Sequence, residues 1–337
     1  MKALVFRGSR KLEVEEVPDP VPAQDGVVLQ VLAAGVCGSD VHGYEGSNGR
    51  RFPGQVMGHE AVGLVVQAGK YADDVLGQVM AFTPIVSCGS CPACLAGQDN
   101  RCATRKLIGV HPELPGAFAE KVAVPRANLL KWSSASAVAG TLVEPLSVVW
   151  RALSALTPVH PKRVLVLGAG TIGSLGALAL KKRLGAEIDI YDPVAWKSEW
   201  LAPQGINVLE SVDLTGDESH VTETFSEYDA VLDCVGSSVS FAAATERVAV
   251  GGRVHILGMA RPVIDYPLER AVTKEVSVTS SYAYNRKEFT EAAQAAEELE
   301  DILMAMEPVT CGLEGAAEKI DSILGPDNRV SKVVITP

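Results

Sequence analysis

The chain has 337 residues, of which 47% are hydrophobic and 21% are charged, and this composition excludes a disordered or fibrous protein. Because a single hydrophobic core rarely extends beyond roughly 250 to 300 residues, the length of the chain predicts two domains. The formal net charge of -11, without any cluster of Lys and Arg, excludes nucleic acid as a partner.

The N-terminal residues predict a β-strand, and they lack the apolar core and the small-residue cleavage site of a signal peptide. No uninterrupted apolar run approaches the roughly 18 residues of a membrane span. We therefore expect a cytoplasmic protein with no membrane partner. In that compartment thiols stay reduced, so disulfides are not expected among the 7 cysteines.

The first part of the chain, to about residue 135, has short β-branched runs broken by Gly, Pro and polar turns, for example residues 27–32. This pattern predicts an antiparallel β region. Two motifs with metal-binding side chains lie in it, Cys37-Gly38-Ser39-Asp40-Val41-His42 and Gly58-His59-Glu60. A single Cys or His is more often a core residue than a ligand, so neither motif alone predicts a metal site.

Four cysteines lie close together in a loop rich in Gly and Pro: Cys88, Cys91, Cys94 and Cys102. Four thiolates form a closed tetrahedral zinc site with no open position for chemistry, which predicts a structural zinc. An iron–sulfur cluster or a redox dithiol is the alternative. The chain has neither a second cluster motif nor a Cys-Pro at the end of this one, so zinc is favoured.

After about residue 145, apolar strands alternate with segments of helical length. This alternation predicts βαβ units in a parallel sheet. The expected strands cover residues 164–167, 188–191, 230–233 and 253–257.

A glycine fingerprint, Gly168-Ala169-Gly170-Thr171-Ile172-Gly173, follows the first of these strands and precedes a helix expected over residues 174–182. In this context the glycines permit a tight turn, a close approach of the backbone to a pyrophosphate, and close packing of helix on strand. The N–H groups at the start of the helix can bind the phosphates.

Coenzyme choice depends on Asp192, which ends the second strand. An acid there accepts hydrogen bonds from the ribose hydroxyls of NAD and repels the extra phosphate of NADP. The sequence therefore predicts NAD, while the alternative interpretation of Asp192 is a turn residue before Pro193. We also assign the segment after the fourth strand to the coenzyme site: Leu257, Gly258 and Met259.

The remaining chain contains an acidic, alanine-rich stretch over 288–304, which predicts a helix, and an apolar run over 330–335, which predicts a strand. A late strand suggests that the C-terminus returns to the first domain. We expect a catalytic domain at 1–146 with a zinc loop at about 86–104, a dinucleotide-binding domain at 147–283, and a return segment at 284–337.

Taken together, the motifs resemble those of zinc-containing medium-chain alcohol dehydrogenases, closest to the sorbitol (polyol) dehydrogenase-like branch. The resemblance covers essentially the whole chain, and the motifs follow one another in the same order as in that family. It is carried by residues 37–42, 58–60, the four cysteines, Gly116–Glu120, Val143–Leu146 and the glycine fingerprint. The resemblance implies an α/β protein with a GroES-like β-rich catalytic domain and a Rossmann doubly wound parallel sheet.

The resemblance also implies a catalytic zinc held by Cys37 and His59, with either Glu60 or Glu144 as a further ligand. Three protein ligands leave one open position for Lewis-acid chemistry. Asp40 would orient His59, and Ser39 would pass the substrate proton through the coenzyme ribose to His42. Outside this family, the plain interpretations are a helix cap for Ser39, a first-turn helix acid for Asp40 and an exposed turn residue for Glu144.

The implied protein is an oxidoreductase that moves a hydride between a secondary alcohol or polyol-like substrate, or the ketone, and NAD. It would hold two zinc ions per chain, one catalytic and one structural, and form a homodimer or homotetramer. The alternatives are a threonine-type or glucose-type dehydrogenase of the same fold, and a non-enzymatic zinc and nucleotide-binding scaffold. A scaffold has no physical need for an open zinc position with a proton relay.

The chain departs from the polyol branch in several segments, among them the loop between Gly63 and Val79, where we expect surface variation. The Arg-Tyr pair that commonly holds substrate hydroxyls is not in its expected place within residues 280–286. Tyr44 and the unusual segment from Glu45 to Phe52 are candidates for lining the substrate pocket. For Arg50 and Arg51 in that segment, a solvated loop is the alternative, and we expect it.

Overall fold

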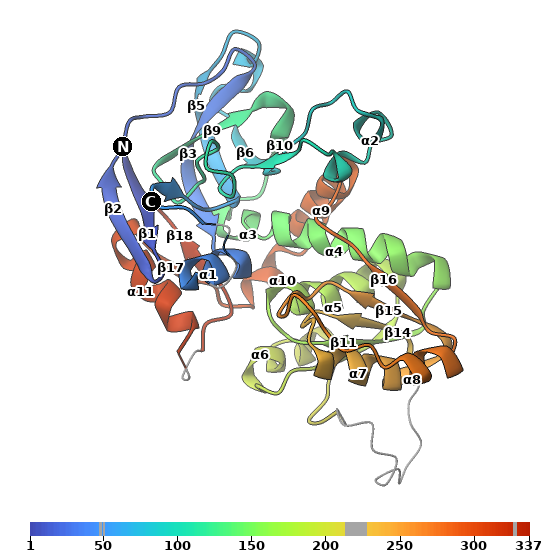
Figure 1. Ribbon diagram of the computed structural model, residues 1–337. Helices are drawn as coiled ribbons and strands as arrows, with labels where there is room; N and C mark the ends of the chain where they lie inside the picture. The colour runs from blue at the N-terminus through green and yellow to red at the C-terminus, as the bar shows by residue number, and fades with distance from the viewer. Residues whose placement is uncertain (47–48, 50, 213–227, 326–328) are drawn as a thin grey trace. The chain divides into compact units, whose positions relative to one another are not determined.

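The computed structural model describes residues 1–46, 49, 51–212, 228–325 and 329–337. These residues form two compact units (Figure 1). Unit 1 consists of Met1–Ser147 and Asn285–Pro337, and unit 2 consists of Val148–Tyr284. Within the described part of the chain, no helix combines the length and the hydropathy needed to cross a lipid bilayer.

The main sheet of unit 1 has the strand order β10-β6-β5-β3-β18-β17, and β9 also pairs with β3. All its pairs are antiparallel except β17 with β18. The strands are β3 (Gly26–Gly35), β5 (Glu60–Ala68), β6 (Val79–Phe82), β9 (Lys121–Pro125), β10 (Leu129–Lys131), β17 (Val309–Cys311) and β18 (Val333–Ile335). The antiparallel β region expected from the β-branched runs is therefore present.

Smaller elements complete unit 1. A three-stranded sheet contains β2 (Lys11–Glu16), β1 (Lys2–Gly8) and β4 (Gln55–Val56), and a two-stranded one contains β7 (Ile85–Val86) and β8 (Lys106–Leu107). The short N-terminal and central helices are α1 (Gly38–Glu45), α2 (Pro92–Leu95) and α3 (Ala137–Gly140). Alternate side chains of β3, among them Val27, Leu29 and Val31, are buried in the core of this unit.

The C-terminal segment of unit 1 contributes α9 (Arg286–Glu298), α10 (Glu300–Met304) and α11 (Leu313–Ile323). The single helix expected over 288–304 is thus two helices, because Leu299 leaves the helical conformation and is buried. Strand β18 pairs with the end of β3, where Val334 lies opposite Gly35. This pairing brings the last strand, and Lys332 just before it, next to the start of α1.

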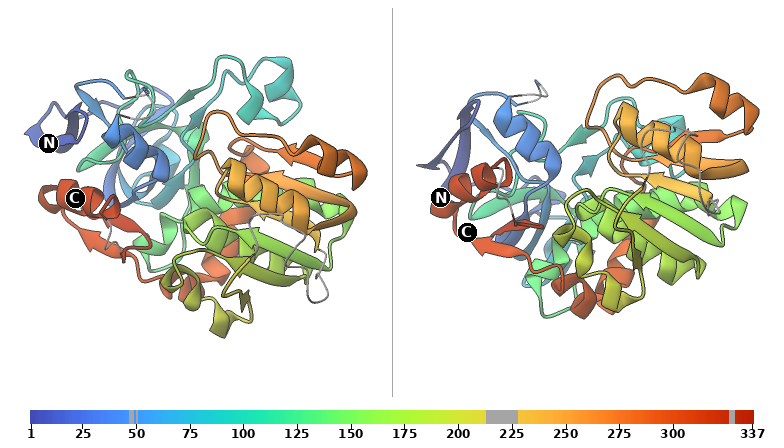
Figure 2. Two further views of the ribbon diagram at one scale, coloured as in Figure 1. Left: turned by 60° about the horizontal axis from the view of Figure 1, so that its bottom comes forward. Right: turned by 90° about the horizontal axis from the view of Figure 1, so that it is seen from below.

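Unit 2 is built around a parallel sheet with the order β13-β12-β11-β14-β15-β16. Its strands are β11 (Arg163–Leu167), β12 (Glu187–Tyr191), β13 (Asn207–Val208), β14 (Tyr228–Asp233), β15 (Val248–Ile256) and β16 (Ser277–Ser280). Its helices are α5 (Thr171–Leu184), α6 (Trp196–Glu199), α7 (Ser238–Arg247) and α8 (Leu268–Thr273), while α4 (Val143–Leu156) enters it from unit 1. Helices cover both faces of the sheet (Figure 2).

The strand order reverses at β11, since the chain runs outward to β12 and β13 and then returns to β14 on the other side of β11. Open parallel sheets bind ligands at such a reversal, outside the carboxyl ends of the strands. The glycine fingerprint follows β11 at this point. The predicted fold class, an α/β protein with a β-rich part and a doubly wound parallel sheet, is confirmed.

Candidate functional site

Three of the predicted metal ligands come together in unit 1 because of the pairing of β3 with β5. Gly35 at the end of β3 lies opposite Glu60 at the start of β5. Cys37 follows β3 and His59 precedes β5, so the pairing brings both beside Glu60. One possible ligand atom from each of the three residues lies within 4.8 Å of the other two.

Two glycines make room for this arrangement. Gly58 has a φ of +97°, which favours glycine, and a Cβ there would lie 2.5 Å from the ring of Phe118. At Gly35, a Cβ would lie 2.5 Å from a carboxylate oxygen of Glu60. A side chain at Gly58 would therefore clash with Phe118 beside His59, and one at Gly35 would displace the carboxylate of Glu60.

The side chain of His59 is buried, and its Nδ1 has no hydrogen-bond partner among the described residues. A carboxylate oxygen of Asp40 lies 3.7 Å from that nitrogen. Although burial disfavours the charged ring, Asp40 and Cys37 raise the pKa of His59 well above its ordinary value. A half-buried thiol, a buried imidazole and a buried carboxylate lie together here, and these are donors that zinc prefers, so the residues fit the metal that the resemblance implies.

Asp40 faces the ring of His59 and also caps the first turn of α1. Its Oδ2 accepts a hydrogen bond from the backbone N–H of Cys37 at 3.2 Å, and Cys37 is the N-cap residue of the helix. The cap is therefore Cys37, not Ser39, whose backbone N–H donates to the Cys37 sulfur at 3.5 Å. Ser39 is half-buried and His42, one turn further along α1, is exposed.

The two candidate carboxylate ligands differ in position. Glu60 is buried, belongs to the group with Cys37 and His59, and forms an ion pair with the buried ammonium of Lys332. Burial disfavours that ammonium, but Glu60 and Cys37 raise its pKa. Glu144 lies in the first turn of α4, half-buried, and adds negative potential at His59 without joining the group.

The four cysteines of the predicted zinc loop also come together. Their sulfurs all lie within 4.8 Å of one another, and three of the sulfur pairs are 3.5, 3.6 and 3.9 Å apart. Four sulfurs at about 2.3 Å from a central zinc would be about 3.8 Å apart, so the loop fits a tetrahedral metal. The backbone N–H groups of Ser90 and Cys91 lower the pKa of Cys88 to about 5, which favours its thiolate.

In unit 2, the three fingerprint glycines are needed for different reasons. Gly168 has a φ of +90°, and a Cβ on Gly173 would lie 1.7 Å from the carbonyl oxygen of Gly168. At Gly170, by contrast, a Cβ would meet nothing within 4 Å, and no side chain caps α5. The first and third glycines are required by the local backbone, whereas the second leaves open space in front of the N–H groups at the start of the helix.

Asp192 lies beside this loop, but its carboxylate has backbone partners. One oxygen accepts a hydrogen bond from Ala169 N and the other from Val194 N, both at 2.9 Å. The bond to Val194 is that of a turn residue, and the bond to Ala169 connects the end of β12 to the fingerprint. Leu257, Gly258 and Met259 follow β15 at the same edge of the sheet.

A buried aspartate that the sequence analysis missed shapes that edge. Asp233, at the end of β14, accepts hydrogen bonds from the N–H groups of Val235 and Gly236 at 2.9 and 3.0 Å. Burial raises the pKa of Asp233. A Cβ on Gly258 would lie 2.1 Å from the backbone of Val235, so the loops after β14 and β15 are in close contact.

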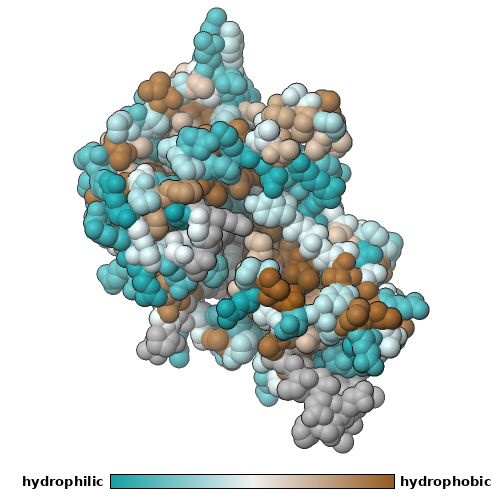
Figure 3. Space-filling model, viewed as in Figure 1, coloured by the Kyte–Doolittle hydropathy of each residue, from teal (hydrophilic) through white to brown (hydrophobic). Residues whose placement is uncertain are grey.

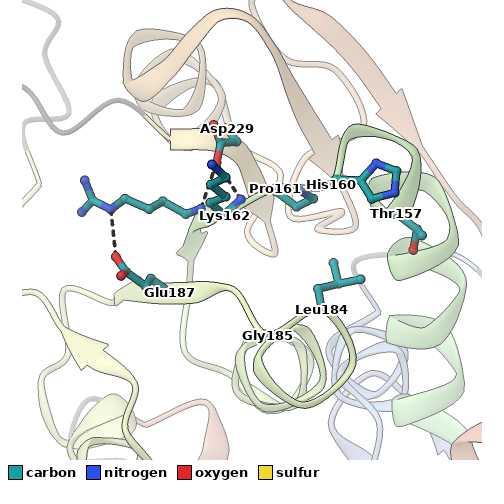
Figure 4. A pocket seen from close by; sticks show the side chains of 9 residues that line it. Thr157, His160, Pro161, Lys162, Leu184, Gly185, Glu187 and Asp229 are labelled. Carbon is teal, nitrogen blue, oxygen red and sulfur yellow. Dashed lines mark hydrogen bonds and ion pairs between the residues drawn. The ribbon is translucent and has the colours of Figure 1, made fainter.

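A cavity in unit 2 lies at the other end of the strands (Figure 4). It is lined by residues at the starts of β11, β12 and β14 and at the end of α5: Thr157, His160, Pro161, Lys162, Arg163, Leu184, Gly185, Glu187 and Asp229. Because open parallel sheets bind coenzymes at the carboxyl ends of the strands, this cavity is distinct from the predicted coenzyme site.

The structure corrects the expectation for Arg51, whose side chain is buried rather than solvated. Its guanidinium pairs with Asp40 at 2.8 Å, which compensates the cost of burial. Arg50 lies outside the described residues. Tyr44 is buried in unit 1, where its hydroxyl contacts Arg10 O at 3.2 Å and Asp321 at 3.4 Å.

Two family models match the chain. Residues 23–134 match the alcohol dehydrogenase GroES-like domain, and residues 171–298 match the zinc-binding dehydrogenase model. Among curated proteins, L-galactonate-5-dehydrogenase of Escherichia coli (strain K12) is 28% identical over 297 residues, which cover 87% of this chain and 86% of that protein. L-Threonine 3-dehydrogenase of Pyrococcus horikoshii is 32% identical over 271 residues, which cover 77% of this chain and 75% of that protein.

Solved structures show the same relationship. A protein from Sinorhizobium meliloti 1021, described as a zinc-binding dehydrogenase bound to NADP, has a TM-score of 0.87 at 26% identity and covers 100% of this chain and 99% of its own. An alcohol dehydrogenase from Escherichia coli CFT073 in complex with NADH has a TM-score of 0.86 at 25% identity, with the same coverage. The chain belongs to the zinc-containing alcohol dehydrogenase family, and it is an oxidoreductase with a GroES-like part and a Rossmann-like part. The predicted resemblance and enzyme class are confirmed.

Proposed function

We propose that this chain is a zinc-dependent dehydrogenase that transfers a hydride between a secondary alcohol or polyol-like substrate and NAD. The observation that carries the proposal is the group of Cys37, His59 and Glu60, in which the histidine and the carboxylate are buried, with Asp40 3.7 Å from Nδ1 of His59. Buried mixed donors with an adjacent carboxylate are typical of a catalytic rather than a structural metal site.

Cys37 and His59 would hold the catalytic zinc, and the position of Glu60 in the same group favours it over Glu144 as the carboxylate ligand. Zinc bound there would supply a Lewis acid that favours the deprotonated form of an alcohol. Asp40 would keep the imidazole in one orientation and one tautomer. Lys332 would balance the charge of Glu60, because both groups are buried.

Ser39 and His42 would carry the substrate proton to solvent. They lie three residues apart on α1, so their side chains share one face of the helix, and Ser39 is half-buried while His42 is exposed. Such a path gives the proton an exit from a site whose histidine and carboxylate are buried. In this proposal the coenzyme ribose connects the two residues.

The four-cysteine loop would bind a second, structural zinc, so we propose two zinc ions per chain. The support is the sulfur geometry, which uses all four donors and leaves none for chemistry. Metal analysis of the purified protein tests this count. Two zinc ions per chain are expected, whereas iron with inorganic sulfide would favour the cluster alternative.

NAD is the coenzyme that Asp192 favours. The carboxylate lies at the end of β12, beside the fingerprint, where its charge would repel a 2′-phosphate. The open space at Gly170 and the uncapped start of α5 would take the pyrophosphate. Leu257, Gly258 and Met259 would line the same edge, with Thr171 and Ile172 at the start of the helix.

We also propose a cytoplasmic homodimer or homotetramer that associates through unit 2. Strand β16 is at the edge of the sheet, and exposed apolar side chains lie on and near α8: Val263, Tyr266, Leu268 and Val272 (Figure 3). Unpaired strand edges and apolar patches favour association. Light scattering after gel filtration should give a dimer or larger for the native chain and a smaller mass for Leu268→Glu.

The experiment that tests the proposed activity is a screen of alcohols, polyols and amino alcohols with NAD and with NADP, followed by the absorbance of the reduced nicotinamide. Turnover should disappear after treatment with a chelator and return when zinc is added. Turnover of threonine or glucose in preference to polyols would favour the alternative dehydrogenases. A protein that holds zinc and nucleotide but oxidises no alcohol would contradict the proposal and favour a scaffold.

A further inference from the structure

Arg51 stands out in unit 1 as a buried cation that the proposed chemistry does not use. Its side chain is 2% exposed. A guanidinium in such a place is costly unless it is paired and hydrogen-bonded. Its Nη2 donates to Asp40 Oδ1 at 2.8 Å, and its Nε lies 3.1 Å from the sulfur of Met57.

Helix α1 is shaped to receive this side chain. Gly43 lies in the helix, where glycine is less favourable than alanine. A Cβ there would lie 2.5 Å from Cγ and 2.9 Å from Nε of Arg51. The glycine therefore leaves a space on the helix surface that the stem of Arg51 fills on its way to Asp40.

Asp40 connects Arg51 to the metal-binding group. Its Oδ1 accepts a hydrogen bond from the guanidinium of Arg51. Its Oδ2 accepts a hydrogen bond from the backbone N–H of Cys37 at 3.2 Å and lies 3.7 Å from His59 Nδ1. A single buried carboxylate thus contacts the backbone of one proposed ligand and faces the ring of another. Its position depends on the groups that hold both of its oxygens.

We propose that Arg51 is a positioning residue for the catalytic metal, which acts through Asp40 to hold His59 in its ligating orientation. This inference rests on the proposed metal site at Cys37 and His59. Groups that orient a ligating histidine typically change metal affinity or activity by about 10-fold to 100-fold when they are removed. Arg51 acts one contact further out than Asp40, and it holds one of the two carboxylate oxygens of Asp40.

The test measures zinc affinity of the full-length protein by competition with a chelator of known affinity. Arg51→Met should weaken zinc binding at the Cys37–His59 site by about 10-fold to 100-fold. The four-cysteine loop serves as an internal reference whose zinc should be unaffected. Arg51→Lys keeps the charge but loses the planar fork, so its loss should be smaller.

A matched control is available in the same unit. Arg126 pairs with Asp74 through two hydrogen bonds, at 3.0 and 2.6 Å, but both side chains are exposed. Arg126→Met should leave both zinc affinities unchanged. The melting temperature of each variant separates a metal effect from a general loss of stability.

A double-mutant cycle tests the route through Asp40. If Arg51 acts through that carboxylate, Asp40→Asn combined with Arg51→Met should lose about as much zinc affinity as Asp40→Asn alone. If the fold-loss in zinc affinity of the double variant equals the product of the losses of the two single variants, the proposal is overturned. An Arg51→Met protein with a lower melting temperature but native zinc affinity would overturn it too.

The zinc content of the native protein distinguishes failure of the proposed function from failure of this inference alone. If the native protein holds zinc in the four-cysteine loop and none at Cys37 and His59, both the catalytic proposal and this inference are overturned. If the native protein holds both zinc ions and Arg51→Met binds them equally well, only the role of Arg51 is overturned.

Discussion

Unit 1 contains two candidate metal sites, and they are built in opposite ways. The four-cysteine loop takes all its donors from one short segment, Cys88 to Cys102, and its residues range from exposed to buried. The group of Cys37, His59 and Glu60 takes its donors from the ends of two paired strands, and its histidine and carboxylate are buried.

The difference extends to the surroundings. Around the second group, two carboxylates each face a buried cation, Glu60 with Lys332 and Asp40 with Arg51. Identical donors in a local loop can bind a metal with little help from the rest of the fold. Mixed donors on separate strands need tertiary structure to bring them together and charged neighbours to balance them. We therefore expect changes at the second group to affect chemistry and changes in the loop to affect stability.

The largest effect is expected from Cys37→Ala. Loss of a Lewis acid removes several kcal/mol of transition-state stabilisation, and each 1.36 kcal/mol corresponds to a tenfold change in rate. Steady-state kinetics should show kcat/KM lower by about 10³-fold or more, with one zinc per chain retained. Cys311→Ala is the control, because that cysteine lies in β17 outside both groups. Equal activity of the two variants would refute the assignment of Cys37.

A smaller effect is expected from Ser39→Ala. General acid–base steps contribute typically 10²-fold to 10⁴-fold, so kcat should fall by about 10²-fold if water replaces the hydroxyl only in part. The backbone N–H of Ser39, which donates to Cys37, is unchanged by this substitution. Zinc content and the KM for NAD should therefore stay the same. Unaltered turnover would mean that the proton leaves by another route.

Asp192→Ala should change coenzyme preference rather than overall rate. Removing the carboxylate relieves the repulsion of a 2′-phosphate, and the ratio of NADP to NAD turnover should rise by about tenfold. Asp229→Ala is a matched control at the opposite end of the same sheet, because its carboxylate also accepts two backbone N–H bonds, at 2.7 and 2.9 Å. If both variants change the ratio equally, the effect comes from the fold and not from the coenzyme.

Sequence patterns predict the sites whose residues lie near one another in the chain. The fingerprint follows β11 as expected and a helix comes with it, although α5 begins at Thr171, inside the fingerprint, and not at residue 174. The four sulfurs also meet, and both features depend on local spacing. The strand alternation after residue 145 likewise predicts the parallel sheet. In each case the physical cause, a turn, a helix start or a set of thiols, is contained in a short segment.

The charged neighbours of the Cys37–His59 group could not be predicted in this way. Arg51 lies in an irregular polar segment that favours a solvated loop, and Lys332 adjoins an apolar strand near the C-terminus. Burial of each depends on a carboxylate from another element: Asp40 on α1, 11 residues from Arg51, and Glu60 on β5, 272 residues from Lys332. Gly43 offered one local signal, since a glycine inside a short helix usually has a packing reason.

The smallest effect on chemistry is expected from Cys94→Ser in the loop. A ligand present at 100 times its Kd stabilises the folded state by about 2.7 kcal/mol, so loss of this zinc should lower Tm by roughly 5 to 10 °C. Because none of the groups around His59 is touched, kcat/KM at low temperature should stay within about twofold of the native value. Differential scanning calorimetry and kinetics on the same sample measure both quantities. A variant that keeps its Tm but loses turnover would contradict the division between a structural loop and a catalytic group. The loop, and not only the Cys37–His59 group, would then take part in the chemistry.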